Sequence, residues 1–171
     1  PIILGCFAHL KSIMKSLFVA VLAALAAQAS MAQDAKPGSV QAGEKKAAMC
    51  IGCHGIKGYQ ASLPEIHRVP MISGQGAKYL VASLNAYKKG ERKHPTMKGI
   101  SVSLTDTDMA DLAAYYEQHG GARAAVPEQP VAASADVQAL LTKGACVSCH
   151  GANFNKPIDG SYPKIAGQHA D

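Results

Sequence analysis

The chain has 171 residues and carries 17 lysines and arginines against 12 aspartates and glutamates, which gives a formal net charge of +5 at pH 7. This excess is too small to argue for a nucleic-acid-binding protein. The sequence has no tryptophan and only three phenylalanines, and small domains with so little core material are marginally stable unless something else holds them together.

The N-terminal region has the pattern of an export signal. Residues 1–13 are interpreted as a translated upstream extension without function. Residues 14–32 begin with a basic region at Lys15, continue with an apolar run and end in small residues that suit cleavage after Ala32. The apolar run is too short for a transmembrane helix, although an uncleaved anchor is the alternative. The pattern predicts a periplasmic protein with a signal peptide.

Two motifs of the form C-x-x-C-H follow the signal. They are Cys50, Cys53 and His54, and Cys146, Cys149 and His150. This spacing is the attachment pattern of c-type haem. Two cysteines three positions apart lie on one face of a helical turn, so both can form thioethers to one porphyrin, and the following histidine becomes the proximal iron ligand. The motifs predict two covalently attached haem c groups.

Other interpretations of these cysteines are weaker. Disulfide pairing would leave the two histidines unexplained. A zinc site is disfavoured because Cys146 follows Cys50 by 96 residues, far beyond the roughly 15–20 of a ribbon-type site. A thioredoxin-like redox motif requires a βαβ context, and no strand-rich pattern surrounds either motif.

The two motifs belong to an internal repeat. Pro70-Met71-Ile72-Ser73-Gly74-Gln75 follows the first motif, and Pro163-Lys164-Ile165-Ala166-Gly167-Gln168 follows the second. We predict a first domain over residues 33–122, a proline-containing linker over 123–133, and a second domain over 134–171. The counterpart of residues 79–122 is missing after the second motif, so we expect the second domain to be truncated.

The apolar spacing predicts helices and no sheet. Residues 39–51 and 136–145 each form a helix that leads into a motif, and residues 76–90 place tyrosines and leucines on one helical face. Thr105 and Asp108 form a capping box at the start of a further helix. The expected fold class is all-α, with two tandem domains.

The first haem requires a sixth ligand, and Met97 is the candidate. Met49 adjoins the first motif, Met71 is not repeated in the second half, and Met109 fits the apolar stripe of a helix. Met97 lies in a polar segment, interpreted as a loop, that could fold over the open porphyrin face. His94 is the alternative, and it would give an iron with two histidine ligands.

Two further expectations concern the ligand surroundings. The repeat places the sixth ligand of the second haem beyond Asp171, outside this chain. A proximal histidine also needs an acceptor for its other N–H group. Pro70 and Pro163 recur at matching places, so their carbonyls are candidates, although prolines that merely stiffen the two loops would match equally well.

Basic residues cluster around the end of the predicted helix over 76–90. They are Lys88, Lys89, Arg92, Lys93 and Lys98. Such a cluster fits a docking rim for an acidic redox partner, or simply the solvated end of a helix.

With these residues in place, the chain resembles the class I dihaem cytochromes c, in particular the cytochrome c4 family. The resemblance covers about residues 36–171 and is carried by both C-x-x-C-H motifs, both P-x-I-x-G-Q segments, Tyr79-Leu80 heading a helix, Gly90-Glu91-Arg92-Lys93 before Met97, and a closing helix from Leu104 to Tyr116. It departs from its own repeat at residues 56–69, which are longer than their counterpart in the second half.

The resemblance implies two all-α domains packed as a pair, each with a His/Met-ligated haem. It implies a periplasmic electron carrier, free or associated with the membrane, that passes electrons between respiratory proteins and a terminal oxidase. No nucleophile–base pair indicates an enzyme. The alternatives are a dihaem electron-accepting subunit of a flavin- or metal-dependent dehydrogenase, and a haem that is open to external ligands.

Overall fold

The computed structural model describes residues 37–118 and 132–169, which belong to one compact unit. The predicted upstream extension, the signal peptide and most of the predicted linker lie outside the described residues. Within the described ranges no helix is long and apolar enough to cross a bilayer.

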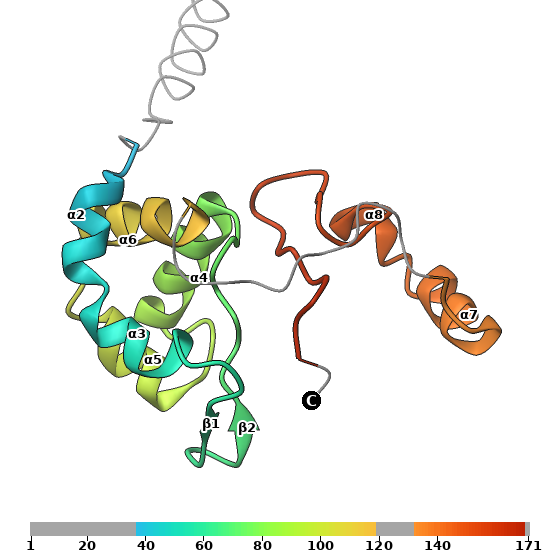
Figure 1. Cartoon of the computed structure of the whole chain (residues 1–171), viewed down its shortest axis with the longest axis horizontal. Helices are drawn as coiled ribbons and strands as arrows, with labels where there is room; N and C mark the ends of the chain where they lie inside the picture. The colour runs from blue at the N-terminus through green and yellow to red at the C-terminus, as the bar shows by residue number, and fades with distance from the viewer. Residues whose placement is uncertain (1–36, 119–131, 170–171) are drawn as a thin grey trace, which may run out of the picture. The chain divides into compact units, whose positions relative to one another are not determined.

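The described part of the chain is mostly helical, as expected (Figure 1). Before the undescribed linker the helices are α2 (Val40–Lys46), α3 (Ala48–His54), α4 (Ala77–Lys89), α5 (Pro95–Ser101) and α6 (Asp106–Gln118), and after it they are α7 (Ala135–Lys143) and α8 (Val147–His150). The predicted first helix is thus two helices that meet at Ala47, and the second of them runs on to include the whole first motif.

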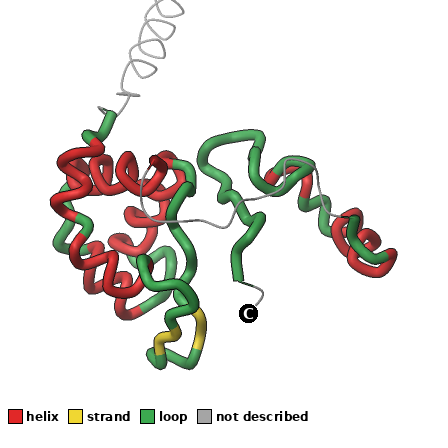
Figure 2. Tube along the Cα trace, in the orientation of Figure 1, coloured by secondary structure: helices red, strands yellow, loops and turns green. Residues whose placement is uncertain are grey.

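The expectation that no strand would occur is wrong in one place. Strand β1 (Gln60–Ala61) pairs antiparallel with β2 (His67–Arg68), as the yellow segments of Figure 2 show. Each strand is two residues long, so no alternation of apolar and polar residues can reveal it. The hairpin falls within residues 56–69, the stretch that has no equal-length counterpart in the second half.

The core lies where α2, α4 and α6 meet. The buried cluster consists of Ala47, Leu80, Leu112, Ala113 and Tyr116. Helix α6 packs against α2 and α4, and α4 also packs against α5. In Figure 1, α2 and α6 run side by side at the edge of this group. Within residues 37–118 the fold therefore packs α2 against α6 and leaves α3, α4 and α5 to surround the site.

A close crossing joins α2 to α6. A Cβ atom added at Gly43 would lie 2.0 Å from the backbone oxygen of Asp111, which is less than any real contact. Beside this crossing the ammonium group of Lys46 lies 2.7 Å from a carboxylate oxygen of Asp108 and 2.6 Å from one of Asp111. Asp111 also accepts a hydrogen bond from the amide of Ser39 at 2.7 Å. Glycine permits the approach and these polar contacts fix it.

Two helix ends have clear caps, one of which was predicted. The amide of Asp108 donates to the hydroxyl oxygen of Thr105 at 3.1 Å, and the amide of Thr105 donates to the carboxylate of Asp108 at 3.0 Å. The predicted capping box is therefore confirmed. Helix α4 ends at Gly90, whose φ of 82° is the left-handed conformation that glycine adopts without strain.

Residues 132–169 are built differently. None of them is buried, and apolar side chains such as Leu140 and Ile158 are exposed. Ser134 caps α7 by accepting a hydrogen bond from the amide of Val137. The rest of this part is a long loop after α8 (Figure 2).

Candidate functional site

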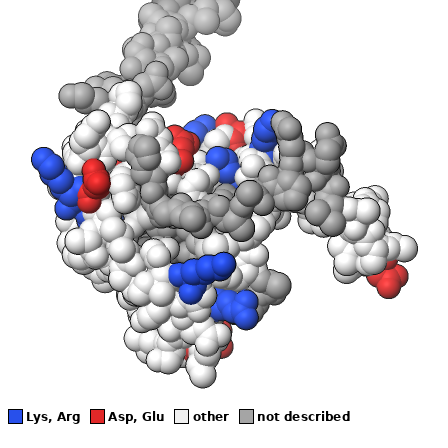
Figure 3. Space-filling model, viewed as in Figure 1, with Lys and Arg blue, Asp and Glu red and all other residues white. Residues whose placement is uncertain are grey.

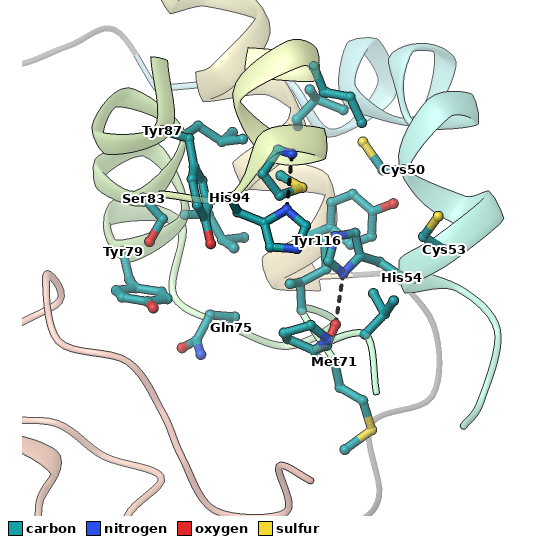
Figure 4. A pocket seen from close by; sticks show the side chains of 18 of the residues that line it. Cys50, Cys53, His54, Met71, Gln75, Tyr79, Ser83, Tyr87, His94 and Tyr116 are labelled. Carbon is teal, nitrogen blue, oxygen red and sulfur yellow. Dashed lines mark hydrogen bonds between the residues drawn. The ribbon is translucent and has the colours of Figure 1, made fainter. Parts of the chain in front are cut away.

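Helix α3 presents the first motif on one helical turn. Cys50, Cys53 and His54 lie along one wall of a cavity, as Figure 4 shows. The four motif cysteines are all free thiols, so the disulfide alternative finds no support in the structure. Among the described residues there is also no cluster of metal-ligating side chains of the kind a zinc site requires.

The ring of His54 is held by the backbone of the first repeated segment. Its Nδ1 atom lies 2.7 Å from the carbonyl oxygen of Pro70. A carbonyl oxygen can only accept, so the proton sits on Nδ1 and the Nε2 lone pair is left free. Burial lowers the pKa of His54 below its ordinary value. The His54 ring is therefore held in a fixed orientation with Nε2 unblocked, the arrangement in which an imidazole can bind a metal.

The second motif repeats this geometry. Helix α8 carries Cys149 and His150 and begins directly after Cys146. The Nδ1 atom of His150 lies 2.8 Å from the carbonyl oxygen of Pro163. The two histidines are thus oriented by the same backbone group of the two repeated segments, and the first of them lines the cavity described next.

The cavity beside the first motif has a volume of about 400 Å³. Its walls come from α3, α4, α5 and α6, and they are largely apolar. Residues 163–165 and Gln168 of the second half also contribute to the lining. Tyr116 is only 2 % exposed, and its hydroxyl has no hydrogen-bond partner in the described structure. Burial raises the pKa of this phenol and of the nearby Cys50 thiol.

Met97 lines this cavity together with His54. The segment is not the loop expected from the sequence, because Met97 lies in α5, where Pro95 occupies the first turn. Proline fits there since its missing N–H would be unpaired anyway. The amide of Met97 donates to Nδ1 of His94 at 3.4 Å, so His94 is the N-cap of α5. The short helix thereby gives the thioether a defined place on the wall.

His94 also lines the cavity, and its ring makes an edge-to-face contact with His67 of the hairpin at 5.4 Å between centroids. Its Nδ1 is occupied by the cap. Met49 and Met71 also line the cavity, but Met49 is 63 % exposed and the side chain of Met71 extends away from His54 in Figure 4. Met109 is fully buried in α6.

Arg92 lies at the polar edge of the cavity. Its guanidinium donates to the hydroxyl oxygens of Tyr79 at 3.1 Å and Ser83 at 3.0 Å, and it lies 4.7 Å from the ring centroid of Tyr87. Arg92, one of the five basic residues of the predicted docking rim, therefore lies at the edge of the cavity. On the face drawn in Figure 3 the basic side chains form several separate groups.

Three functional candidates were not predicted from the sequence. Gln75 and Gln168 each form hydrogen bonds to the other half of the chain. The sequence shows a glutamine at the last position of both repeated segments, but the repeat alone does not show which groups these glutamines contact. The buried hydroxyl of Tyr116 gave no signal, because its tyrosine fits a helical apolar stripe.

The cavity has the donor set for a c-type haem. Two thiols, a neutral imidazole and a thioether share one largely apolar space, and the partnerless hydroxyl of Tyr116 lies against it. Cys50 and Cys53 would hold the group covalently, and His54 and Met97 would face its iron. Fold and site together define a c-type cytochrome, and residues 40–119 match the family model for cytochrome c.

Comparison with known proteins shows the family to which the chain belongs. The chain is 34 % identical over 146 residues to cytochrome c4 of Azotobacter vinelandii, an alignment that covers 78 % of this chain and 68 % of that protein. The chain belongs to the cytochrome c4 family, whose members are dihaem electron-transfer proteins and not enzymes. Its C-x-x-C-H motifs are accordingly haem c attachment motifs.

A solved structure and a further relative add to this. The fold matches that of reduced cytochrome c4 from Pseudomonas stutzeri with a TM-score of 0.53 and 29 % identity, over 78 % of this chain and 75 % of that one. The chain is also 30 % identical to a thiosulfate dehydrogenase electron acceptor of Stutzerimonas stutzeri, over 88 % of this chain and 71 % of that protein.

Proposed function

We propose that this protein is a periplasmic dihaem electron carrier of a respiratory chain. The observation that carries the proposal is the pairing of His54 with Met97 in one largely apolar cavity. Iron held between a histidine and a methionine exchanges one electron with little rearrangement and has no free position for a substrate. The cavity of the first domain is thus suited to electron transfer without bond chemistry.

Each residue of the first domain's cavity has a separate role in the proposal. Cys50 and Cys53 hold the porphyrin, and the Pro70 carbonyl fixes the ring of His54. The cap by His94 positions α5 and with it Met97. Apolar side chains on α4 and α6 exclude water from the cavity. This arrangement limits the reorganisation that accompanies a change of charge.

The second domain is proposed to bind its haem through Cys146, Cys149 and His150. Residues 132–169 contain no methionine. We therefore propose that its sixth ligand is supplied from outside residues 132–169. The domain boundaries of the proposal are those of the repeat, with residues 33–122 and 134–171 joined by 123–133.

The proposed partners are redox proteins with an acidic docking surface. Lys89, Lys93 and Lys98 are exposed and stand near the cavity that α5 closes. Long-range attraction between opposite charges accelerates encounter and weakens as salt is added. The signal peptide pattern at 14–32 supports export to the periplasm, with a peripheral membrane association as a further possibility of the same proposal.

Carbon monoxide tests the closed site. The reduced protein with both haems attached should not bind carbon monoxide at the first haem, because Met97 occupies the sixth position. The oxidised protein should show the weak methionine–iron charge-transfer band at the red end of its absorption spectrum. Rapid binding at the first haem, together with absence of the band, would contradict the proposal and favour a ligand-binding haem.

A second candidate function is electron acceptance from a dehydrogenase. The similarity to a thiosulfate dehydrogenase electron acceptor over 88 % of this chain is the observation in its favour. The two functions are separated by mixing the oxidised protein with a bacterial thiosulfate dehydrogenase and thiosulfate, and the reduced protein with a terminal oxidase. Fast reduction with slow oxidation favours the acceptor subunit, and fast oxidation favours the respiratory carrier.

A further inference from the structure

Two glutamine side chains connect the halves of the repeat through backbone groups. Oε1 of Gln168 accepts from the amide of Met71 at 3.0 Å, and its Nε2 donates to the Met71 carbonyl at 3.0 Å. Gln75 pairs in the same way with Lys164, at 2.8 Å to the amide and 3.0 Å to the carbonyl. Each glutamine, the last residue of its repeated segment, thus contacts the second residue of the other segment.

The residue that each glutamine contacts shares a peptide unit with a proline that holds a haem-binding histidine. In the first half, the carbonyl of the Pro70–Met71 peptide accepts from Nδ1 of His54, while the N–H of the same peptide donates to Gln168. A hydrogen-bonded path therefore runs from the His54 ring through one peptide unit to the glutamine of the other half.

The second half contains the same path in reverse. The carbonyl of the Pro163–Lys164 peptide accepts from Nδ1 of His150, and its N–H donates to Gln75. Both paths have the same sequence of groups, and each crosses from one half of the repeat to the other.

We propose that these glutamines are positioning residues that tune the iron of the opposite half, with Gln168 acting on the haem at His54 and Gln75 on the haem at His150. This inference rests on the proposed function, in which both motifs carry haem. A peptide whose N–H is engaged by an acceptor is polarised, so its carbonyl becomes a stronger acceptor. The histidine then becomes a more electron-rich ligand, which favours oxidised iron and lowers the reduction potential.

Burial and further hydrogen bonds hold both glutamine side chains in place. Gln75 is only 3 % exposed, although it is a polar residue. Its Oε1 also accepts from the amide of Gly76 at 3.1 Å, and Oε1 of Gln168 accepts likewise from the amide of His169 at 3.3 Å. The side-chain amide of each glutamine is therefore held by two residues. Its oxygen stays directed at the peptide N–H of Met71 or Lys164 in the other half.

The test uses the full chain with both haems attached. Methionine has nearly the shape of glutamine but lacks the acceptor oxygen, so the variants are Gln168→Met and Gln75→Met. The control is Lys78→Ala, which removes the Lys78–Asp159 ion pair between the same two halves and leaves both peptides untouched. The Nδ1–H proton signals of His54 and His150, assigned through their contacts to Pro70 and Pro163, are followed by NMR through a redox titration.

A crossed result is expected. Gln168→Met should raise the potential at His54 and move its Nδ1–H signal upfield, and Gln75→Met should do the same at His150, while Lys78→Ala changes neither. Equal shifts at both haems in each variant, a shift in the variant's own half, or no shift would each overturn the inference.

Should a methionine variant fail to fold, the variant Gln168→Glu provides the test. Its carboxylate is a stronger acceptor and should lower the potential at His54 by more than at His150. An equal or absent shift overturns the inference. Failure of the unaltered protein to carry two redox-active haems would instead contradict the proposed function.

Discussion

At the scale of single residues, two methionines in neighbouring helices have opposite roles. Met97 lines the cavity from α5, and Met109 is fully buried in α6. The first therefore faces the proposed haem and the second fills the core. Substitution of each by alanine separates ligand chemistry from stability.

Met97→Ala should abolish the methionine–iron charge-transfer band and open the first haem to carbon monoxide, because the thioether is removed. Met109→Ala should keep the band and lower the free energy of unfolding by about 2–5 kcal/mol, the usual cost of truncating a buried methionine. Absorption spectra and denaturant titrations measure both. An unaltered band in the Met97 variant would transfer the ligand role to another methionine of the cavity, such as Met71, whereas absence of the band from the unaltered protein would favour His94.

Single residues also show where sequence reasoning succeeds. The C-x-x-C-H motifs and the Thr105–Asp108 capping box are local patterns, so their geometry could be predicted from spacing alone. Met97 was assigned to a loop because the surrounding residues are mostly polar and a helix of seven residues is too short to show an apolar stripe. The glutamine contacts join residues about ninety positions apart and depend on how the halves pack.

At the scale of helices, the contact between α2 and α6 has no tolerance for added volume. A methyl group at Gly43 would meet the Asp111 backbone oxygen at 2.0 Å, and backbone cannot move aside as a side chain can. We expect Gly43→Ala to cost about 3 kcal/mol, at the upper end of overpacking effects. Gly52→Ala is the matched control, since nothing lies within 4 Å of its Cβ position. Equal thermal midpoints for the two variants would contradict this prediction.

The same pair of helices should respond to acid. The ammonium group of Lys46 is the largest cause that lowers the pKa of Asp108 and of Asp111 below the ordinary 3.8. A carboxylate whose pKa is lowered by folding stabilises the protein above the unfolded value and loses that contribution as the pH falls through the folded value. Lys46→Met should therefore reduce the thermal midpoint at pH 7, and its difference from the unaltered protein should shrink below about pH 4. A difference independent of pH would refute the assignment.

Helix positions show the limits of pattern reading. The apolar periodicity of α4 and α6 predicted both helices closely, since each runs for 13 residues and buries one face. The hairpin β1–β2 escaped prediction because two-residue strands leave no periodicity to detect. The break at Ala47 likewise follows from packing, because this residue is fully buried in the cluster below α6.

At the scale of the whole molecule, the haem is expected to complete the core of residues 37–118. Without the haem, the largely apolar walls of the cavity of about 400 Å³ would lose their packing partner. The double variant Cys50→Ala/Cys53→Ala should therefore lose much of its helical circular dichroism. Cys146→Ala/Cys149→Ala is the comparison, and it should retain the first haem and most of the helical signal. Similar losses in both would show that the two halves fold only together.

The pairing of each glutamine with both polar groups of one residue has a consequence for how the two halves differ. A side chain that contacts only backbone N–H and C=O places no demand on the side chain of the residue it binds. That residue is Met71 in one half and Lys164 in the other. The two halves of the repeat can therefore differ at this position without loss of the glutamine contact. The ammonium group of Lys164 donates a further hydrogen bond to the carbonyl of Gly74 at 2.9 Å. One half of the repeat therefore carries a positive charge at this position, and the other half carries the apolar side chain of Met71.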